Sequence, residues 1–469
     1  MQKSHPFDFG LIGLGVMGRN FILNVAGKGF RSLGYDLDPG QVAQLKSEGD
    51  EDQVDATTDL ADFVAGLKRP RKIMMLVPAG APVDAVIESL LPLLEAGDII
   101  VDGGNSFFED TDRREDYLRG KGIHFFGTGV SGGAEGARRG PSIMPGGSHE
   151  AYEELRPVFE AAAARYKGEP CVAYMGPKSA GNYVKMVHNG IEYALMQLIA
   201  EVYDLLHRGA GMDNGELQAL FTRWNRGRLQ SFLVEISADI FGTADPLGPG
   251  ELLDKILDQA KQKGTGKWTS QNALDLGIPV PTIDMAVSMR QLSSLKAQRQ
   301  EAEKRYRSAA PEPVQVEPAQ AENALYLGFV MAYAQGMHLL AEASREYGYG
   351  LQLSEIAKIW RAGCIIRADM LADITEAYKS NPDLPNLLLD ATFAGKVSAC
   401  LPDTRKLLGA AVAAGFPAPA LTSALSYLEA YASGRLPLNL VQAQRDYFGS
   451  HTYQRTDRDG TFHTEWQAD

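Results

Sequence analysis

The chain has 469 residues, of which 45% are hydrophobic and 22% are charged, and its formal net charge is −13 at pH 7. These values are typical of a globular protein of about two to three domains and exclude a disordered chain. The acidic charge argues against a nucleic-acid-binding surface, which would need a basic stripe. The sequence shows no secretory signal, and apolar runs such as 73–77 are too short to cross a bilayer.

The cysteines and the charge together narrow the class of ligand. Cys171, Cys364 and Cys400 are too few for a disulfide framework, and none is spaced as a metal ligand. A negative net charge is still compatible with a phosphorylated small molecule, because such a ligand needs only a few local cations. We therefore expect a reduced, cytoplasmic protein with no metal, no membrane contact and no nucleic-acid partner.

The first segment has the pattern of a dinucleotide-binding site. An apolar run at 7–12, typical of a β-strand, leads directly into Gly13-Leu14-Gly15-Val16-Met17-Gly18, and apolar residues then recur at helical spacing. In such a motif the first glycine permits a tight turn, the second lets the backbone approach a pyrophosphate, and the third lets helix and strand pack closely. The strand before it and the helix after it favour a cofactor site over an ordinary turn.

The second predicted strand, 31–35, ends at an acidic residue, Asp36. A carboxylate there can accept hydrogen bonds from the adenosine ribose of NAD, and it would repel the 2′-phosphate of NADP. Leu37 and Asp38 follow, so no arginine reverses this preference. The alternative is that Asp36 is a plain turn residue. We predict NAD as the cofactor, with NADP as the alternative.

Further strands are predicted at 72–77 and 98–101, with helical stretches between them, which indicates a parallel sheet with ligands at the carboxyl ends of its strands. Two glycine-rich stretches, Asp102-Gly103-Gly104-Asn105-Ser106 and Gly127-Thr128-Gly129-Val130-Ser131-Gly132-Gly133, are expected to begin where strands stop. Their backbone N–H groups and polar side chains suit an anion or hydroxyl groups. The alternative is that both are flexible turns.

From about residue 179 the pattern is helical and the sequence repeats itself. Trp224-Asn225-Arg226-Gly227 recurs as Trp360-Arg361-Ala362-Gly363, and Gly277-Ile278-Pro279-Val280-Pro281 recurs as Gly415-Phe416-Pro417-Ala418-Pro419. The offsets are all about 140 residues, which indicates an internal duplication of a helical unit. A proline- and glutamate-rich stretch at 311–318 separates the copies and is predicted to be a loop.

Only the first copy carries an ionisable helix face. Lys185, His188, Asn189 and Glu192 stand at positions i, i+3, i+4 and i+7, surrounded by apolar residues. At the offset of the repeats Lys185 matches Leu325 and Glu192 matches Ala332, so the second copy keeps the helix without the charges. A solvated face with a Lys–Glu pair is the alternative, and the loss of the charges from the second copy favours a site.

Two further features of the first copy point to a phosphate. Arg290 matches Leu428 of the second copy, and Lys263-Gly264-Thr265-Gly266-Lys267 places cations beside flexible backbone. This segment lacks the spacing of a P-loop, so nucleotide hydrolysis is not indicated.

Together these motifs resemble the 6-phosphogluconate dehydrogenase family over residues 10–466. The most specific pieces are 102–106, 129–133, 185–193, 264–268 and the run Gln444-Arg445-Asp446-Tyr447-Phe448-Gly449. The resemblance implies an α/β Rossmann-type dinucleotide-binding domain at 1–178, a large all-α domain with an internal duplication at 179–436, and a C-terminal tail at 437–469. It also implies a homodimer with interpenetrating tails, in which Arg445 and His451 complete the partner's site.

The resemblance further implies oxidative decarboxylation of 6-phosphogluconate to ribulose 5-phosphate and CO2 in the pentose phosphate pathway, with reduction of NAD or NADP. Lys185 would be the general base toward the 3-hydroxyl group, and Glu192 would protonate C1 of the enediol. The implied contacts to the sugar acid come from Asn105, Ser131, Gly132, Gly133, His188 and Asn189. The implied contacts to its phosphate come from Tyr193, Lys263, Thr265, Arg290 and Arg445, with His451 nearby.

The chain departs from the family pattern in its cofactor segment. NADP-using members carry Asn-Arg-Thr where this chain has Asp36-Leu37-Asp38, and they tend to carry a lysine where Pro78 stands in Val77-Pro78-Ala79. Two cations are therefore missing and two acids are present. We predict an NAD-preferring enzyme whose cofactor contacts residues 13–18, 36–38, 77–79 and Asn105.

Three alternatives to this function remain. A related β-hydroxyacid dehydrogenase would share the cofactor domain and the lysine, but it would not need a phosphate-binding tail. A catalytically inactive sugar-phosphate-binding protein would keep the phosphate contacts without the chemistry, and the presence of Lys185 and Glu192 argues against it. A purely structural role is the weakest, because charges among apolar residues would carry an uncompensated desolvation cost.

Overall fold

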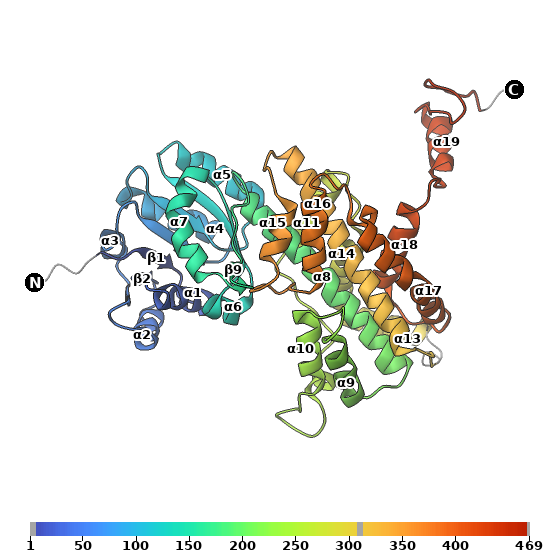
Figure 1. The fold of residues 1–469 in the computed structure, drawn as a ribbon, viewed down its shortest axis with the longest axis horizontal. Helices are drawn as coiled ribbons and strands as arrows, with labels where there is room; N and C mark the ends of the chain where they lie inside the picture. The colour runs from blue at the N-terminus through green and yellow to red at the C-terminus, as the bar shows by residue number, and fades with distance from the viewer. Residues whose placement is uncertain (1–5, 307–312, 467–469) are drawn as a thin grey trace, which may run out of the picture.

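The N-terminal part of the protein is a three-layer α/β unit built on a seven-stranded sheet of order β3-β2-β1-β4-β5-β6-β7 (Figure 1). The structure is a computed structural model that describes residues 6–306 and 313–466. The strands are β1 (Phe9–Ile12), β2 (Ser32–Tyr35), β3 (Val54–Thr57), β4 (Lys72–Met75), β5 (Ile99–Asp102), β6 (His124–Val130) and β7 (Ile143–Gly146). The helices are α1 (Val16–Gly27), α2 (Pro39–Glu48), α3 (Leu60–Ala65), α4 (Ala81–Leu90), α5 (Phe108–Arg119), α6 (Gly133–Arg139) and α7 (His149–Ala162).

The central strands are mostly apolar because helices cover both faces of the sheet, and the charged residues Lys72 and Asp102 stand at strand ends. Side chains such as Phe9 and Leu11 pack with α1 and α7 on one face, and Ile12 and Ile73 pack with α3 and α4 on the other. The strand order reverses between β1 and β4, and in open α/β sheets ligands bind in the crevice beyond such a reversal. The glycine motif at 13–18 follows β1 and therefore lies at this crevice.

Two sequence-based expectations about the sheet differ from the structure. The sequence predicts that a strand stops where the stretch at Gly127 begins, but 127–130 form the second half of β6, and the turn begins at Ser131. The sheet is also not wholly parallel, because β7 pairs with β6 in the antiparallel direction. The glycines of β6 lie in a strand because α8 packs closely on them, a long-range contact that local sequence spacing does not reveal.

The rest of the chain is helical, and its helices occur twice in the same order. The first copy contains α8 (Ala180–Asp204), a π-helical turn η2 (Leu205–Gly209), α9 (Asn214–Trp224), α10 (Phe232–Phe241), the 3-10 turn η3 (Leu252–Lys255), α11 (Thr265–Asp275) and α12 (Pro281–Ser293). The second contains α14 (Pro318–Glu346), α15 (Leu353–Ile359), α16 (Met370–Ser380), the 3-10 turn η4 (Leu387–Leu389), α17 (Ala391–Ala413) and α18 (Pro419–Tyr431). Between them lies α13 (Lys296–Tyr306); of the loop predicted at 311–318, residues 311–312 lie outside the described residues and 318 begins α14.

The two copies complete each other's hydrogen bonds. Both α12 and α18 begin with a proline and have no side-chain cap of their own. Gln335 of α14 accepts from the backbone N–H of Thr282 in α12 at 3.0 Å. In the reverse direction, Glu201 of α8 accepts from the N–H groups of Ala420 and Leu421 in α18 at 2.9 and 2.8 Å, and burial raises the pKa of this carboxyl to about 7. Side chains from one copy thus cap helices of the other.

The helix α14 is the centre of the helical core. It is long and apolar enough to cross a membrane, but 89% of its most apolar window is buried inside the protein. It packs against α8, α17 and α18. These contacts are those of the core helix of a globular domain.

The two domains meet where α8 lies directly on the backbone of β6 and β7 (Figure 1). A methyl group at Gly181 of α8 would stand 2.2 Å from the carbonyl oxygens of Gly127 and Met144. A methyl group at Gly146 of β7 would stand 2.3 Å from the backbone nitrogen of Gly181. Backbone therefore packs on backbone at this junction, with no room for a side chain.

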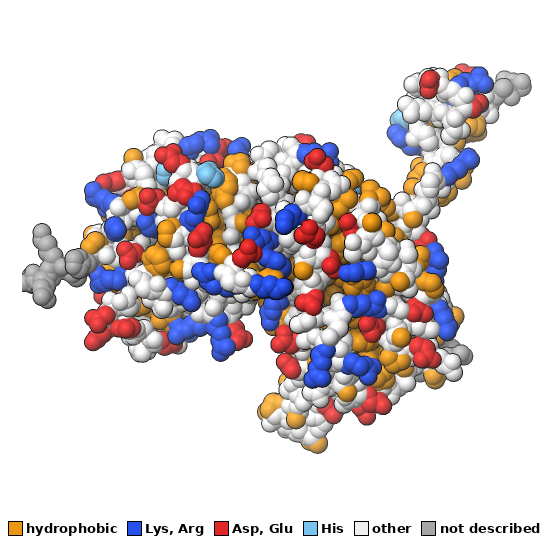
Figure 2. Space-filling view, viewed as in Figure 1, with side chains coloured by type: hydrophobic (Ala, Val, Ile, Leu, Met, Phe, Trp, Pro, Cys, Tyr) orange, Lys and Arg blue, Asp and Glu red, His pale blue; other side chains and the backbone are white. Residues whose placement is uncertain are grey.

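The C-terminal segment extends away from both domains. Its helix α19 (Leu438–Gly449) and the residues that follow stand clear of the body at the end of an arm (Figures 1 and 2). The segment folds around Asp446, whose carboxylate accepts from the backbone N–H of Thr452 at 2.9 Å, that of Thr464 at 3.1 Å and the indole of Trp466 at 2.8 Å. Although desolvation opposes them, these bonds and above all the hydrogen bond with His463, at 2.9 Å, hold the pKa of Asp446 low, at about 2. The tail is thus ordered without help from its own domains.

The close approach at the domain junction generates a testable prediction. We expect Gly181→Ala to lower the free energy of unfolding by about 1–3 kcal/mol or more, because the added methyl group overlaps two carbonyl oxygens. As a control, Gly409→Ala lies within a helix at a position with open space and should raise stability by about 0.5–1 kcal/mol. Urea denaturation measures both, and equal effects of the two substitutions would contradict the packing described here.

Candidate active site

The glycine motif forms a cradle that fits a dinucleotide. Gly13 has φ 92°, a conformation that favours glycine, and a methyl group at Gly18 would stand 1.9 Å from the carbonyl oxygen of Gly13. At Gly15, in contrast, no atom lies within 4 Å of where a methyl group would stand. Gly15 is also the N-cap of α1 and offers no side-chain cap. The first N–H groups of this helix are therefore available to a pyrophosphate.

Asp36 lies against this cradle. Its carboxylate accepts from the N–H of Leu14 at 2.7 Å and from the N–H of Asp38 at 2.9 Å. The capping of α2 is done by Asp38, which accepts from Gly40 at 2.8 Å. Asp36 is therefore not a plain turn residue, because it joins the end of β2 to the glycine loop where an adenosine ribose would lie.

The surroundings of Asp36 hold little positive charge. Leu37 is 82% exposed, and Pro78 and Ala79 are exposed on the loop after β4. Arg19 reaches the carbonyl oxygen of Leu14 at 3.4 Å, but its guanidinium group is already paired with Glu48 at 3.3 Å. A phosphate group at this place would therefore meet an unpaired carboxylate and an arginine that is neutralised.

The ionisable face of α8 is buried. Lys185 is 6% exposed, His188 is fully buried and Asn189 is 8% exposed. The Nζ atom of Lys185 lies 3.3 Å from Nδ1 of His188, and the carboxylate of Glu192 lies 3.8 Å from the same ring nitrogen. The side chain of Glu192 is 21% exposed, so the face is largely shielded from solvent, and the three ionisable groups form one cluster.

Burial shifts the pKa values of this cluster toward neutrality. Desolvation lowers the pKa of Lys185, against the attraction of Glu192. Desolvation raises the pKa of Glu192, against the attraction of Lys185 and Arg290. The pKa of His188 is held well below its ordinary value by burial and by the charge of Lys185. A lysine and a carboxyl group shifted in this way are suited to act as base and acid.

Loops of the dinucleotide domain form one wall of the cluster. The hydroxyl of Ser131, in the turn after β6, lies 3.1 Å from Nε2 of His188. Gly129 of β6 faces Lys185 so closely that a methyl group there would stand 2.5 Å from the lysine Cβ. Gly132 has φ 104°, and Gly133 is exposed beside it. Asn105 is exposed on the loop after β5.

A second group of polar residues extends from the cluster along α8. Asn189 donates to the hydroxyl of Thr265 at 3.1 Å. The guanidinium of Arg290 lies over the ring of Tyr193, 3.5 Å from its centroid, and burial lowers its pKa. Lys263 is exposed on the loop that precedes α11. The structure thus brings four of the residues expected around the phosphate to one end of the site.

The remaining two expected phosphate residues lie elsewhere. Arg445 is on α19 and His451 follows it, and the arm holds both away from the body of the chain (Figure 1). A single chain therefore does not bring them to Lys263 and Arg290.

Cys364 is a member of the cluster that was considered in the sequence only as a disulfide or metal ligand. Its Sγ atom lies 2.8 Å from Nε2 of His188, and the next residue, Ile365, donates its N–H to Ser131 at 3.4 Å. Burial raises the pKa of this thiol to about 12, so it stays protonated. The sequence signal that could have identified Cys364 is the internal repeat. Its counterpart in the first copy is Arg228, so the cysteine is not among the packing residues that the two copies share. Within residues 6–306 and 313–466 no three His, Cys, Asp or Glu side chains group as a metal site.

This fold and site define a dinucleotide-dependent dehydrogenase, with a glycine cradle after β1 and a buried lysine and carboxyl group where α8 packs on β6 of the same sheet. Two family models cover nearly the whole chain. The NAD binding domain of 6-phosphogluconate dehydrogenase matches residues 8–176, and the 6-phosphogluconate dehydrogenase C-terminal domain matches residues 181–466. The chain therefore belongs to the 6-phosphogluconate dehydrogenase family.

Individual relatives agree with this family. The decarboxylating 6-phosphogluconate dehydrogenase of Lactococcus lactis strain IL1403 is 48% identical over 471 residues, with 98% of this chain and 99% of the relative covered. The enzyme of Bacillus subtilis, named as NADP(+)-dependent and decarboxylating, is 48% identical at the same coverage. A solved structure of the Plasmodium falciparum 6-phosphogluconate dehydrogenase, described with its cofactor NADP+ and its substrate 6-phosphogluconate, is 44% identical. It superposes with a TM-score of 0.94 over 98% of this chain and 100% of that one.

Proposed function

We propose that the protein catalyses the oxidative decarboxylation of 6-phosphogluconate to ribulose 5-phosphate and CO2, with reduction of a nicotinamide cofactor, in the pentose phosphate pathway. The observation that carries this proposal is the buried cluster of Lys185, His188 and Glu192 between the cofactor crevice and Arg290. The names and substrate of the relatives described above support it. We propose the cytoplasm as its location, because three free cysteines suit a reducing compartment.

The directions of the pKa shifts support the proposed proton-transfer roles. Lys185, which desolvation favours in its neutral form, removes the proton from the 3-hydroxyl group. The nicotinamide, when bound, takes up the hydride from C3. The protonated lysine then stands beside the new carbonyl oxygen and stabilises the negative charge that develops on it as CO2 leaves. Because a carbonyl polarised in this way decarboxylates readily, the step requires no metal.

Glu192 completes the reaction. Burial raises the pKa of its carboxyl group, which favours the protonated form that can give its proton to C1 of the enediol. His188, kept neutral by burial, can hold a substrate hydroxyl group between Lys185 and Ser131 without adding a charge. The phosphate end of the substrate is bound by Lys263, Thr265, Tyr193 and Arg290.

An absorbance assay with 6-phosphogluconate tests this function directly. We expect reduction of the cofactor with release of CO2, and we expect kcat/KM to rise about tenfold per pH unit below the pKa of Lys185, because only the neutral amine accepts a proton. Lys185→Arg should lose about 10²–10⁴-fold in kcat, since arginine stays protonated. The matched control is Lys178→Arg, at the exposed position just before α8. Parental activity and pH dependence in Lys185→Arg would exclude the lysine as the base.

We propose further that the enzyme prefers NAD. The support is the carboxylate of Asp36 beside the glycine loop, the exposed Leu37 in place of an arginine, and the pairing of Arg19 with Glu48. The relatives from B. subtilis and P. falciparum are described with NADP, so the preference rests on the residues of this chain.

A double substitution tests the preference. Asp36→Asn combined with Leu37→Arg removes the repulsion and adds a guanidinium group, and it should shift the ratio of kcat/KM for NAD over NADP by about 10–100-fold toward NADP. Asp55→Asn, at an exposed pair with Lys46 in the same domain, is the control and should leave the ratio unchanged. A parental enzyme that favours NADP, or an unchanged ratio in the double variant, would refute the role of Asp36.

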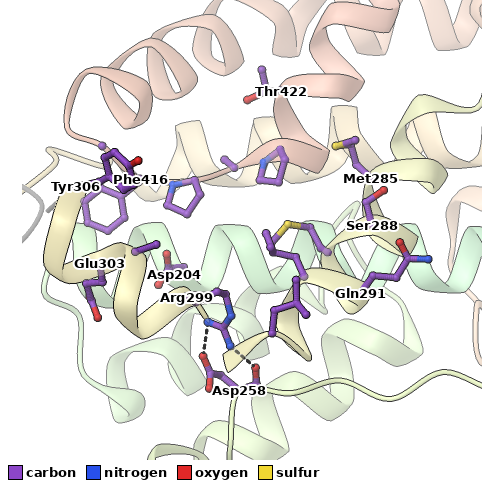
Figure 3. A pocket seen from close by; sticks show the side chains of 18 of the residues that line it. Asp204, Asp258, Met285, Ser288, Gln291, Arg299, Glu303, Tyr306, Phe416 and Thr422 are labelled. Carbon is purple, nitrogen blue, oxygen red and sulfur yellow. Dashed lines mark hydrogen bonds and ion pairs between the residues drawn. The ribbon is translucent and has the colours of Figure 1, made fainter. Parts of the chain in front are cut away.

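We also propose a homodimer in which the tail of each chain completes the site of the other. Apolar side chains of α19, including Leu440 and Phe448, are 62% and 73% exposed. A groove of about 1780 Å³ lies between α12, α13 and α18, with Met285, Tyr306 and Phe416 in its lining (Figure 3). Met289 and Gln291, the neighbours of Arg290, also line this groove. A tail that arrived along it would therefore bring Arg445 next to the phosphate end.

Subunit complementation tests the exchange of tails. Lys185→Ala and Arg445→Ala are each expected to inactivate their own homodimer. When the two chains are unfolded together and refolded in equal amounts, half of the dimers are mixed, and one of the two sites in each mixed dimer has both residues intact. We expect about a quarter of the parental activity to return. No recovery, with mixed dimers shown to be present, would mean that the tail does not act on the partner.

A further inference from the structure

The indole of Trp268 joins the two ends of the site. Trp268 belongs to α11 and lies one turn after Thr265, and its backbone N–H donates to the carbonyl of Gly264 at 3.0 Å. Its ring packs against Phe107 of the dinucleotide domain, with 5.1 Å between ring centroids. Phe107 directly follows the loop 103–106 that carries Asn105. The contact therefore connects the loop at the sugar-acid end with the loop at the phosphate end.

Each of the two loops is also anchored to α8. On the phosphate side, Thr269 of α11 donates to the carbonyl of Met186 in α8 at 2.9 Å, and Gly266 lies against the ring of Tyr193. On the sugar-acid side, the carbonyl of Gly104 accepts from Asn182 of α8 at 3.3 Å. Both loops are thus tied to α8, at places about one to three turns apart, and the aromatic pair forms a further contact between them.

The pair is backed by a rigid aromatic cluster. Phe107 packs on Phe108 with centroids 4.8 Å apart, and Phe108 packs edge-on against Tyr183 of α8 at 5.1 Å. Asn272 of α11 donates to the hydroxyl of Tyr347 at 2.7 Å, and Tyr347 in turn contacts Phe108 at 5.4 Å. This close packing therefore limits the movement of the Phe107 ring away from Trp268. Phe107 and Trp268 are both only half-buried, at the edge of this cluster nearest the site.

We propose that Trp268 is a positioning residue that, through Phe107, sets the distance between the Asn105 loop and the Lys263–Thr265 loop and so fits the site to the length of a phosphorylated sugar acid. This role rests on the function proposed above. Trp268 contributes no charge and no proton, and its contact matters only to a ligand that spans both loops. A ligand that occupies one end alone does not depend on it.

The affinities for 6-phosphogluconate and for inorganic phosphate distinguish this positioning role from a general effect of Trp268 on the structure of the site. In Trp268→Ala we expect the KM for 6-phosphogluconate to rise about tenfold, with kcat within about threefold and the KM for the cofactor unchanged. The inhibition constant of inorganic phosphate, which occupies only the phosphate end, should change by less than about twofold. Trp268→Phe retains a ring against Phe107 and should recover most of the substrate affinity.

Two further variants guard against a trivial loss of folding. Phe107→Leu removes the same contact from the other side and should reproduce the pattern, and the double variant Phe107→Leu/Trp268→Ala should show less than the product of the single effects. Tyr117→Ala removes an exposed aromatic side chain elsewhere on α5 and should leave all constants unchanged.

The outcomes below separate a failure of the proposed role of Trp268 from a failure of the proposed function. A parallel rise in the KM for 6-phosphogluconate and in the inhibition constant of phosphate would show that Trp268 only shapes the phosphate loop, and the proposal would fail. No change in either would also overturn it. If the parental protein does not oxidise 6-phosphogluconate at all, the proposed function fails instead, which is a different result from an active parent with unaffected variants.

Discussion

The contact of α8 with the backbone of β6 and β7 is the constraint on which the site depends. Because Gly181 meets Gly127 and Met144 with no side chain between them, the first turn of α8 is fixed relative to the sheet. Lys185 follows one turn later and packs on Gly129 of the same strand. The amine is thereby held at a fixed place beside the cofactor crevice, although the crevice and the lysine belong to different domains.

The duplication explains why only one half of the helical domain carries chemistry. Both copies supply a long central helix to the core, but Leu325 and Ala332 of α14 are fully buried apolar residues where α8 has Lys185 and Glu192. The second copy contributes in another way, since its loop after α15 brings Cys364 to His188. One copy thus holds the ionisable groups, and the other encloses them.

Features that depend on local spacing could be predicted from the sequence, and features that depend on distant contacts could not. The glycine cradle and the face of α8 follow from the order of nearby residues. The extent of β6 does not follow from nearby residues. Gly127 is typical of a turn, but it lies in a strand on which α8 packs too closely for a side chain. The contact of Cys364 with His188 spans 176 residues, and no local pattern indicates it.

The reciprocal capping of α12 and α18 has a consequence for the history of the fold. Gln335 accepts a hydrogen bond from a first-turn N–H group of α12 in the first copy. Glu201 accepts hydrogen bonds from two first-turn N–H groups of α18 in the second copy. Neither copy alone has acceptors for all of its buried first-turn N–H groups, so the two must fold as one cooperative unit. At the offsets of the repeats Gln335 matches Leu195 and Glu201 matches Glu342, so the two caps are not one contact that occurs twice. The present exchange of caps was therefore acquired after the duplication, as the two copies diverged and came to depend on each other.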